Sequence, residues 1–235
     1  MSVFQINEKS HLQKSMFFDE PVDVQRFDMV KYAPIDRLTE TQQSYFWQPT
    51  EISCDTDRLD YKNLPAHEKH IFVSNLRRQI LLDSVQGRSP NLVLLPIVSL
   101  PEVEGFINTW CFMESIHSKS YTHIIRNVYP NPSVVFDEMT DIDEIVQCAA
   151  DISKYYDELE DMNMIFNKYG YGTHVLNGET VVLDSYEHKK ALWKCLNSIN
   201  ILEAIRFYVS FACTFAFGEN KLMEGSAKIV RFICR

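Results

Sequence analysis

The sequence of 235 residues contains only seven glycines, and none of them forms a glycine-rich phosphate-binding loop. Loops of that kind hold nucleotide phosphates against the backbone of a helix start, so their absence argues against the common nucleotide-binding folds. A G-x-S-x-G sequence is also missing, which excludes the nucleophile elbow of the α/β-hydrolases.

Positive charge is scarce as well. Lysine and arginine total 23 against 32 aspartates and glutamates, which gives a net charge of −9. A protein that tracks a phosphate backbone normally presents a basic surface, because neutralised phosphates supply most of the affinity. We therefore predict no nucleic-acid partner.

Long uninterrupted apolar runs are absent too. The longest apolar stretches are broken by Pro96 and Pro101, or carry Glu203 and Arg206. A membrane-crossing helix needs about 20 predominantly apolar residues, so we predict no membrane span. The first residues, MSVFQINEKSHLQKS, have no apolar core of the kind that a secretory signal requires.

The six cysteines include no C-x-x-C pair. Three of them, Cys111, Cys195 and Cys213, lie in apolar helical sequence, where a free thiol is an ordinary core residue. This pattern argues against a disulfide framework and a zinc ribbon, and indicates a reducing, cytoplasmic location.

What the sequence does contain is helical periodicity, with apolar residues three and four apart over most of its length. We predict helices at 27–47, 65–87, 101–128, 141–168 and 186–217, and another from residue 221. Asn177-Gly178 lies between β-branched residues in HVLNGETVVL and predicts one hairpin near residues 173–183. The sequence thus predicts an all-α bundle with one small hairpin, preceded by a mobile tail at 1–15.

One predicted helix carries polar residues where a core helix would not. In TWCFMESIHSKSYTHIIRN, Glu114, His117 and Tyr121 are spaced i, i+3 and i+7, which places them in a single stripe. Two further helices each add an acidic residue to an apolar stripe, Asp83 and Glu203. Buried carboxylates cost several kcal/mol unless they are neutralised, and a shared pair of metal ions would neutralise all three.

Carboxylate oxygens with imidazole nitrogen suit iron or manganese, and di-iron bundles combine single carboxylates with Glu-x-x-His motifs. The motif alone is weak, because Glu8-x-x-His11 also fits in the predicted tail. Two alternatives stay open at this point: an ion pair of Glu203 with Arg206, and a mononuclear site of Asp83, Glu114 and His117.

Longer stretches are more specific. The segments MFFDEPVDVQRFD, SYFWQPTEI, LLDSVQGRSP, FMESIHSKSYTHIIRN and LEAIRFYVSFACTFAF resemble the small, radical-bearing subunit of class I ribonucleotide reductase. The resemblance extends from residue 16 to residue 235. It implies a ferritin-like di-iron helical bundle, and the enzyme activity of a ribonucleoside-diphosphate reductase that makes deoxyribonucleotides.

The resemblance also implies roles for individual residues. Asp83 and His117 would bind the first of two iron ions, Glu114 would bridge the pair, and Glu203 would bind the second; manganese is the alternative metal. Tyr121 would carry the radical. Trp47 would relay electrons, and an apolar pocket would shield the radical, formed by Phe207, Phe211 and Ile233.

The sequence departs from the family pattern after …EGSAKIVRFICR, since the Asp-Glu pair and second Glu-x-x-His that follow in the family are absent from it. The bundle is therefore expected to be incomplete. A complementary C-terminal small-subunit fragment would supply the missing ligands, alongside a homodimer-type self-association and the large subunit. The alternatives are a non-catalytic remnant that only dimerises or binds small subunits, and another di-iron bundle oxidase.

Overall fold

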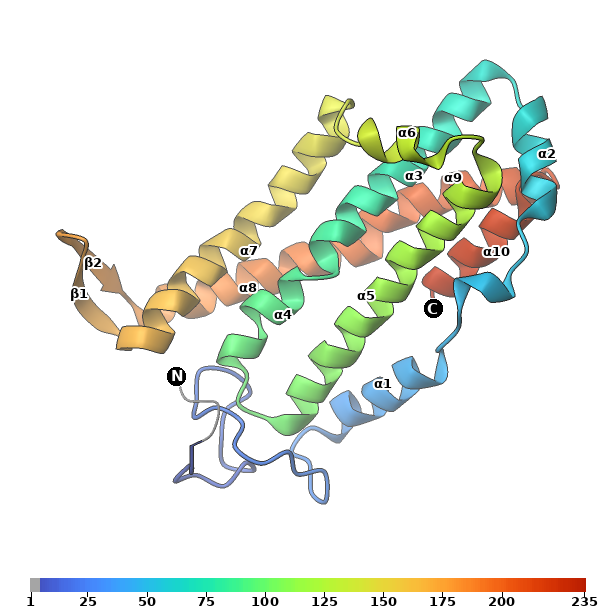
Figure 1. Cartoon of the computed structure of the whole chain (residues 1–235). Coiled ribbons are helices and arrows are strands. Elements are labelled where there is room, and N and C mark those ends of the chain that lie inside the picture. Colours follow the sequence, from blue (N-terminus) through green and yellow to red (C-terminus); the bar gives the residue numbers. More distant parts are fainter. Residues whose placement is uncertain (1–4) are drawn as a thin grey trace. The chain divides into compact units, whose positions relative to one another are not determined.

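The computed structural model describes residues 5–235 and is mainly helical (Figure 1). The longer helices are α1 (Ala33–Ser44), α2 (Asp55–Asn63), α3 (Ala66–Gln86), α5 (Pro101–Val128), α7 (Asp143–Tyr169), α8 (Ser185–Ile201), α9 (Phe207–Glu219) and α10 (Glu224–Ile233). Shorter helical segments are η1 (Pro49–Glu51), α4 (Ser89–Val93), η2 (Leu95–Ile97), α6 (Pro132–Asp137) and the π-helical turn η3 (Leu202–Arg206). The prediction of an all-α chain with one hairpin is confirmed.

The chain divides into two compact units, each assembled from three segments. Unit 1 contains the residues up to 44, residues 88–112 and residues 153–198. Unit 2 contains residues 45–87, 113–152 and 199–235. Every residue to which the sequence gave a site role belongs to unit 2, so the site is described within that unit alone.

The hairpin in unit 1 has the turn that its sequence predicts. Strands β1 (Gly172–Leu176) and β2 (Glu179–Leu183) pair antiparallel, with Leu176 opposite Glu179. The two linking residues, Asn177 and Gly178, both have positive φ, at 50° and 87°. A type I′ turn requires this at both positions, which explains the Asn-Gly sequence.

Helix α1 is shorter than the predicted range of 27–47. It begins at Ala33, with Pro34 in its first turn, where a missing N–H costs nothing. The residues just before it are held differently, because the backbone N–H groups of Lys31 and Tyr32 both donate to the buried carboxylate of Glu102, at 3.0 and 2.9 Å. That contact with a distant residue replaces the helical bonds predicted from local sequence.

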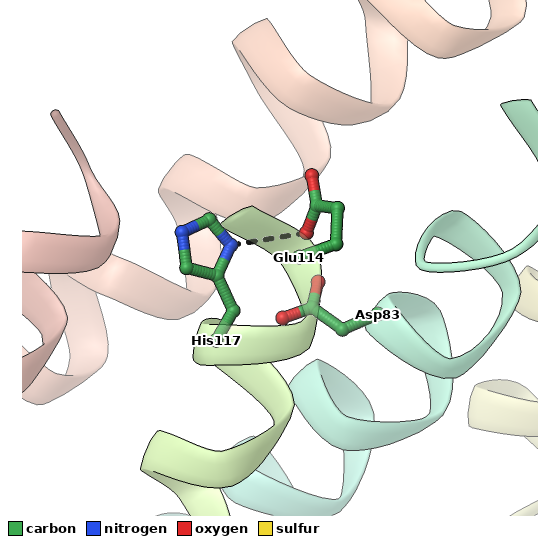
Figure 2. A group of neighbouring side chains, drawn as sticks. All are labelled: Asp83, Glu114 and His117. Atoms are coloured by element: carbon green, nitrogen blue, oxygen red, sulfur yellow. Dashed lines mark hydrogen bonds and ion pairs between the residues drawn. The ribbon is translucent and has the colours of Figure 1, made fainter. Parts of the chain in front are cut away.

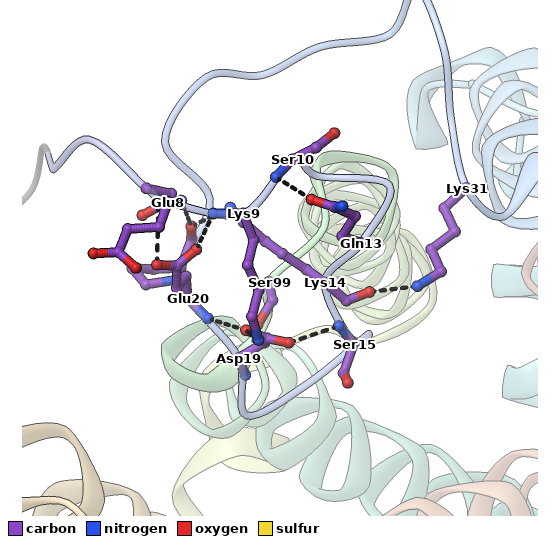
Figure 3. Close-up of polar contacts among 12 residues, drawn as sticks. Glu8, Lys9, Ser10, Gln13, Lys14, Ser15, Asp19, Glu20, Lys31 and Ser99 are labelled. Atoms are coloured by element: carbon purple, nitrogen blue, oxygen red, sulfur yellow. Dashed lines mark hydrogen bonds and ion pairs between the residues drawn. The ribbon is translucent and has the colours of Figure 1, made fainter.

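The segment before α1 is irregular but makes many polar contacts (Figure 3). Lys14 is 1% exposed and its ammonium donates to the carbonyl of Pro21 at 3.0 Å. The Asp19 carboxylate accepts from Lys9 Nζ and from the Ser15 amide. Residues 1–4 of the predicted mobile tail lie outside the described residues, and mobility of residues 5–15 stays a prediction.

A buried histidine in unit 1 is surrounded by aromatic rings. The side-chain NH₂ group of Asn163 donates a hydrogen bond to the Val93 carbonyl. The side-chain oxygen of Asn163 therefore accepts the hydrogen bond that His188 donates from Nε2, at 2.8 Å. Its ring lies 4.5 Å from that of Phe18 and 5.4 Å from that of Phe166. Burial lowers the pKa of His188 to about 4, so the ring is neutral and structural.

In unit 2, α3 packs beside α9, and α10 packs against both α9 and α2. Polar contacts fix the α3–α9 pair: Asn75 donates to the Ser210 carbonyl at 2.9 Å, and Arg78 donates to the Arg206 carbonyl at 2.8 Å. These bonds satisfy carbonyls around the π-helical turn, where the regular helical ladder is interrupted.

The start of α10 is held by a carboxylate from α2. Asp57 is fully buried and accepts from the Gly225 amide at 3.0 Å and from the amide and hydroxyl of Ser226, both at 2.7 Å. A negative charge at a helix N-terminus satisfies otherwise unpaired N–H groups and interacts favourably with the helix dipole. A Cβ on Gly225 would lie 2.5 Å from the Ser53 carbonyl oxygen, so the approach requires glycine.

One helical run among the described residues, from Ser185 to Glu219, is long and apolar enough to cross a membrane. The criterion is length and composition, and core helices of soluble proteins also meet it. This run carries Glu203 and Arg206 near its middle. The absence of a membrane span therefore stays a prediction.

Candidate metal centre

Two helices bring together three side chains of the types that can bind a metal ion. Asp83 comes from the last turns of α3, while Glu114 and His117 come from one face of α5 (Figure 2). One donor atom from each lies within 4.8 Å of the other two. His117 Nδ1 is 3.0 Å from Glu114 Oε2, the distance of a hydrogen bond. The i, i+3 spacing seen in the sequence therefore does place Glu114 and His117 side by side.

The fourth predicted ligand, Glu203, lies in the π-helical turn η3. It lines a cavity of about 200 Å³ together with Asp83, Glu114 and His117. The remaining wall is formed by Phe207, Tyr208, Phe211, Ile233, Cys234 and Arg235. Three carboxylates predicted from three separate stretches of sequence thus share one cavity.

The carboxylates are poorly satisfied where they stand. Asp83 is 2% exposed, and its Oδ2 has no hydrogen-bond partner among the described residues. Glu203 Oε1 is buried and equally without a partner. A buried polar atom without a partner costs roughly 1–3 kcal/mol, more if charged, so the cavity as built favours a bound cation.

The pKa values of Asp83 and Glu203 reflect the same unfavourable environment for a charged carboxylate. Burial and then the charge of Glu114 raise the pKa of Asp83 well above its usual range. Burial, followed by the charges of Glu114 and Asp83, raises the pKa of Glu203 to about 8. A divalent cation would reverse both effects by favouring the ionised carboxylates. The donor set of carboxylate oxygens and one imidazole nitrogen fits iron or manganese.

Arg206 does not pair with Glu203, which was the structural alternative for that carboxylate. Its guanidinium instead donates to the backbone carbonyl of Cys148 at 3.4 Å. Glu203 therefore lines the cavity without an ion-pair partner in Arg206.

Tyr121 lies one turn after His117 on α5 and is completely buried. Its hydroxyl lies beside the carboxylate of Asp83. Burial first, and then the negative charge of Asp83, raise the pKa of this phenol well above its usual range. The side chain is therefore a neutral phenol in a dry setting, electrostatically coupled to the carboxylate cluster.

The predicted apolar pocket also lies on the cavity wall. The rings of Phe207 and Phe211 stack with centroids 5.8 Å apart and an angle of 15° between their planes. Both rings and Ile233 are buried, at 3%, 6% and 8% exposure. These side chains exclude water from one side of the cavity.

Trp47 is buried beyond the end of α1, and its indole stacks on Phe232 of α10 with centroids 5.2 Å apart. Its Nε1–H has no hydrogen-bond partner among the described residues. The structure does not bring Trp47 to the cavity wall.

Sequence reasoning missed three residues of the wall, Tyr208, Cys234 and Arg235. Tyr208 and Cys234 each follow a predicted pocket residue by one position, and helical periodicity assigns such neighbours to different faces. The π-helical turn was also missed, since no local sequence pattern announces it.

Comparison with known proteins decides the family. A model of the family described as "Ribonucleotide reductase, small chain" matches residues 26–235. The chain belongs to the ribonucleotide reductase small-chain family.

Members of known name are similar along the whole chain. The β subunit of ribonucleoside-diphosphate reductase 1 from Salmonella typhimurium is 54% identical over 234 residues, and the β subunit from Enterobacteria phage T4 is 40% identical over 243. These alignments cover 100% of this chain but 62% and 63% of the two relatives. The small-chain sequence described here thus spans less than two thirds of their length.

Solved structures confirm the predicted fold. The R2 subunit from Clostridium botulinum superposes with a TM-score of 0.78 at 23% identity, covering 99% of this chain and 66% of that one. The dimanganese(II)-NrdF of Streptococcus sanguinis gives 0.69 at 22% identity, over 91% and 65% of the two chains. At these identities the likeness establishes the fold, which is the ferritin-like helical fold of this small-chain family.

Proposed function

We propose that residues 1–235 form the tyrosine-bearing part of a ribonucleoside-diphosphate reductase small subunit. The observation that carries the proposal is the cavity in which Asp83, Glu114, His117 and Glu203 converge. Asp83, one of these residues, has a buried oxygen without a partner among the described residues and acts electrostatically on a buried phenol, Tyr121. The family assignment supports the proposal that this arrangement is a metal and radical site.

In this proposal Asp83 and His117 would hold one ion, Glu203 would hold a second, and Glu114 would bind both. When bound, a pair of ferrous ions would supply the electrons that dioxygen activation requires, and manganese suits the same donors. Four side chains are too few for two ions, so the remaining ligands come from polypeptide outside residues 1–235. The resemblance assigns them to an Asp-Glu pair and a second Glu-x-x-His.

The protein's own contribution is to make Tyr121 oxidisable and its radical durable. Oxidation of a phenol at neutral pH removes an electron and the hydroxyl proton. Asp83 is the carboxylate whose charge acts most strongly on Tyr121, and its unpartnered Oδ2 is the proposed proton acceptor. Stacked Phe207 and Phe211 line the cavity with Asp83, where in this proposal they would limit the access of water and reductants.

Trp47 is the proposed entry point for electrons. Its buried indole N–H has no acceptor among the described residues, which supports an acceptor contributed by the proposed complementary polypeptide. Stacking on Phe232 holds the ring in place while that partner is bound. The role is inherited from the resemblance and supported by this unsatisfied donor.

The proposed assembly pairs this chain with a complementary small-subunit polypeptide, a second copy and the large subunit, in the cytoplasm. The product would be deoxyribonucleotides. Co-expression with the downstream segment of a close relative tests this proposal through the tyrosyl signal in electron paramagnetic resonance. The signal is expected in the complex and lost in the Tyr121→Phe variant; a complex that binds iron without any radical contradicts the proposal.

Metal binding is tested on the chain alone by anaerobic ferrous titration. His117→Ala is expected to weaken binding at least about tenfold, because even outer-shell losses have that effect. The control is Glu8→Ala, which disrupts the other Glu-x-x-His sequence at an exposed position. Equal effects of the two variants would contradict the site.

A second candidate is a mononuclear site on this chain. It is favoured by the compact cluster of Asp83, Glu114 and His117, whose donor atoms lie within 4.8 Å of one another. Glu203 is not part of this cluster. Metal analysis distinguishes the two: one ion per chain, unaffected by Glu203→Gln, supports the mononuclear site. Two ions in the assembled complex, with one lost in Glu203→Gln, support the dinuclear site.

A further inference from the structure

Two tyrosines of unit 2 are joined by a hydrogen bond outside the wall of the metal cavity. Tyr61 lies in α2, and Tyr129 directly follows α5. Their hydroxyl oxygens are 2.6 Å apart, which is the distance of an O–H···O hydrogen bond. Their ring centroids are 4.8 Å apart, with 40° between the planes. Two oxidisable rings that are 68 residues apart in the sequence are therefore in direct contact.

The packing of α3 and α9 holds the Tyr61 ring in this position. The ring of Phe72 in α3 lies 5.9 Å from that of Tyr61 and is 1% exposed. Phe217 in α9 meets Phe72 edge to face, with centroids 5.7 Å apart. Packed rings of this kind keep one orientation, because interiors leave little free volume. The contact between the two tyrosines is thus a fixed feature of unit 2.

Both tyrosines are half-buried, so part of each phenol is accessible to small molecules in solution. Burial, and then the hydrogen bond with Tyr61, raise the pKa of Tyr129 above its usual range. Tyr129 is therefore a neutral phenol at neutral pH, and its oxidation removes an electron together with the hydroxyl proton. In a pair joined by one hydrogen bond, the accepting hydroxyl keeps its own proton free to leave to water. The phenoxyl oxygen that results still accepts the hydrogen bond from its neighbour.

We propose that Tyr61 and Tyr129 form an oxidative cross-linking site, which a one-electron oxidant from solution converts to dityrosine. In the balanced step each phenol gives one electron and one proton, and two equivalents of the oxidant are reduced. The two phenoxyl radicals then form a C–C bond between ring carbons that flank the C–O carbons. The hydrogens on those two carbons move to the oxygens, which restores both phenols. The net loss is two electrons and two protons.

The contact favours this pair over other tyrosines in the chain. A phenoxyl radical carries spin on the ring carbons next to its C–O carbon, and the converging hydroxyls of Tyr61 and Tyr129 bring these sides of the rings together. Tyrosines on separate molecules must first meet by diffusion. Reactants that are already held in place avoid that entropic cost, so coupling within the chain is expected to be faster.

The bond would tie α2 covalently to the residue after α5. It would close a loop of 68 residues, and a cross-link of that kind stabilises a protein mainly by restricting the unfolded chain. Helix α2 also holds the start of α10 through Asp57. Oxidation at this site would therefore strengthen unit 2 instead of damaging it.

The test uses the full chain without metal, at low concentration, illuminated with tris(bipyridine)ruthenium(II) and persulfate. The ruthenium(III) complex that forms is a one-electron oxidant. Trypsin separates the two tyrosines, because Arg58 and Lys62 flank Tyr61 and Arg126 precedes Tyr129. Mass spectrometry of the monomer fraction is expected to show the two peptides joined with two hydrogens lost. We expect this link to be at least about tenfold more abundant than any other link between tyrosines.

Three variants isolate the pair. Tyr129→Phe and Tyr61→Phe keep the rings and remove one phenol each, so either should abolish the link. Tyr186→Phe is the matched control: Tyr186 is 71% exposed and more accessible than the pair, yet the variant should leave the link unchanged. Oxidised wild type should melt at least about 5 °C above the untreated protein, and oxidised Tyr129→Phe should show no such rise.

The wild-type protein alone decides the outcome. Oxidation spread over exposed tyrosines such as Tyr186, without a link between Tyr61 and Tyr129, overturns the inference. A link found only in covalent dimers, with a yield that rises with protein concentration, also overturns it. A link in the monomer at a yield independent of concentration supports it. Because no metal is present, neither result bears on the proposed metal site.

Discussion

Two aspartates of unit 2 are equally buried but differ in the hydrogen bonding of their carboxylates. Asp57 accepts three hydrogen bonds at the start of α10, whereas Asp83 has an oxygen with no partner and faces a cavity. Their exposures of 0% and 2% are the same for this purpose. Burial alone therefore does not mark a functional carboxylate; the state of its oxygens does.

The contrast between the two aspartates would be wrong if replacing Asp57 did not lower the stability of the protein. Asp57→Ala leaves two amides and one hydroxyl unsatisfied, so we expect a loss of about 4 kcal/mol in the free energy of unfolding. Urea denaturation measures it. Asp55→Ala is the control, because Asp55 is exposed on the same helix and should change stability by less than about 0.5 kcal/mol.

The cavity side of the comparison predicts an unusual pH dependence. With its pKa raised from 4.5 to about 8, Glu203 takes up a proton on folding between those pH values. Its contribution to the stability of the metal-free protein is therefore complete at low pH and lost as pH rises through about 8. We expect the wild type to lose about 3 kcal/mol relative to Glu203→Gln between about pH 5 and pH 8. Parallel stability curves for the two proteins would be inconsistent with this.

His188 predicts the opposite slope in unit 1. Its pKa falls from 6.5 to about 4 on folding, so its contribution is present above pH 6.5 and is lost as pH falls towards 4. The expected loss between about pH 7 and pH 5 is about 2 kcal/mol. Thermal unfolding of wild type and His188→Gln across this range measures the difference, and a slope shared by both would exclude His188 as its source.

The smallest effect sharpens the contrast between the aspartates. Asp83→Asn removes a charge from the carboxylate cluster, so the metal-free protein should gain about 1 kcal/mol. The same variant should lose the extra stability that ferrous iron gives the wild type, since a ligand of the folded state stabilises by mass action. Melting curves with and without iron measure both effects. Destabilisation of the metal-free variant would show that Asp83, like Asp57, stabilises the fold through its carboxylate.

The residues and elements that could be predicted are those with a recognisable pattern in the local sequence. An acidic residue on an apolar stripe is visible in sequence, and this identified Asp83, Glu114 and Glu203 as neighbours before any coordinates. The hairpin followed from Asn177-Gly178 for the same reason. Roles for Tyr121 and Trp47 depended on the resemblance, because burial of an aromatic residue is by itself ordinary.

What sequence could not supply depends on contacts between distant segments. Helix α2, with the sequence DTDRLDYKN, has little apolar periodicity, so neither it nor the function of Asp57 was predicted. The start of α1 depends on Glu102, whose carboxylate accepts from the Lys31 amide 71 residues earlier in the sequence. Cys234 entered the cavity through the docking of α10, which no local pattern encodes.

The π-helical turn at Leu202–Arg206 has a consequence for variation in this helix. Such a turn accommodates one residue more than a regular helix of the same length. Deleting a single residue there would restore the regular hydrogen-bonding ladder and leave the orientation of Phe207 and Phe211 unchanged, whereas a deletion in the regular helix before the turn would rotate both rings about the helix axis by about 100°. The turn is therefore the point at which this helix best tolerates a change in length.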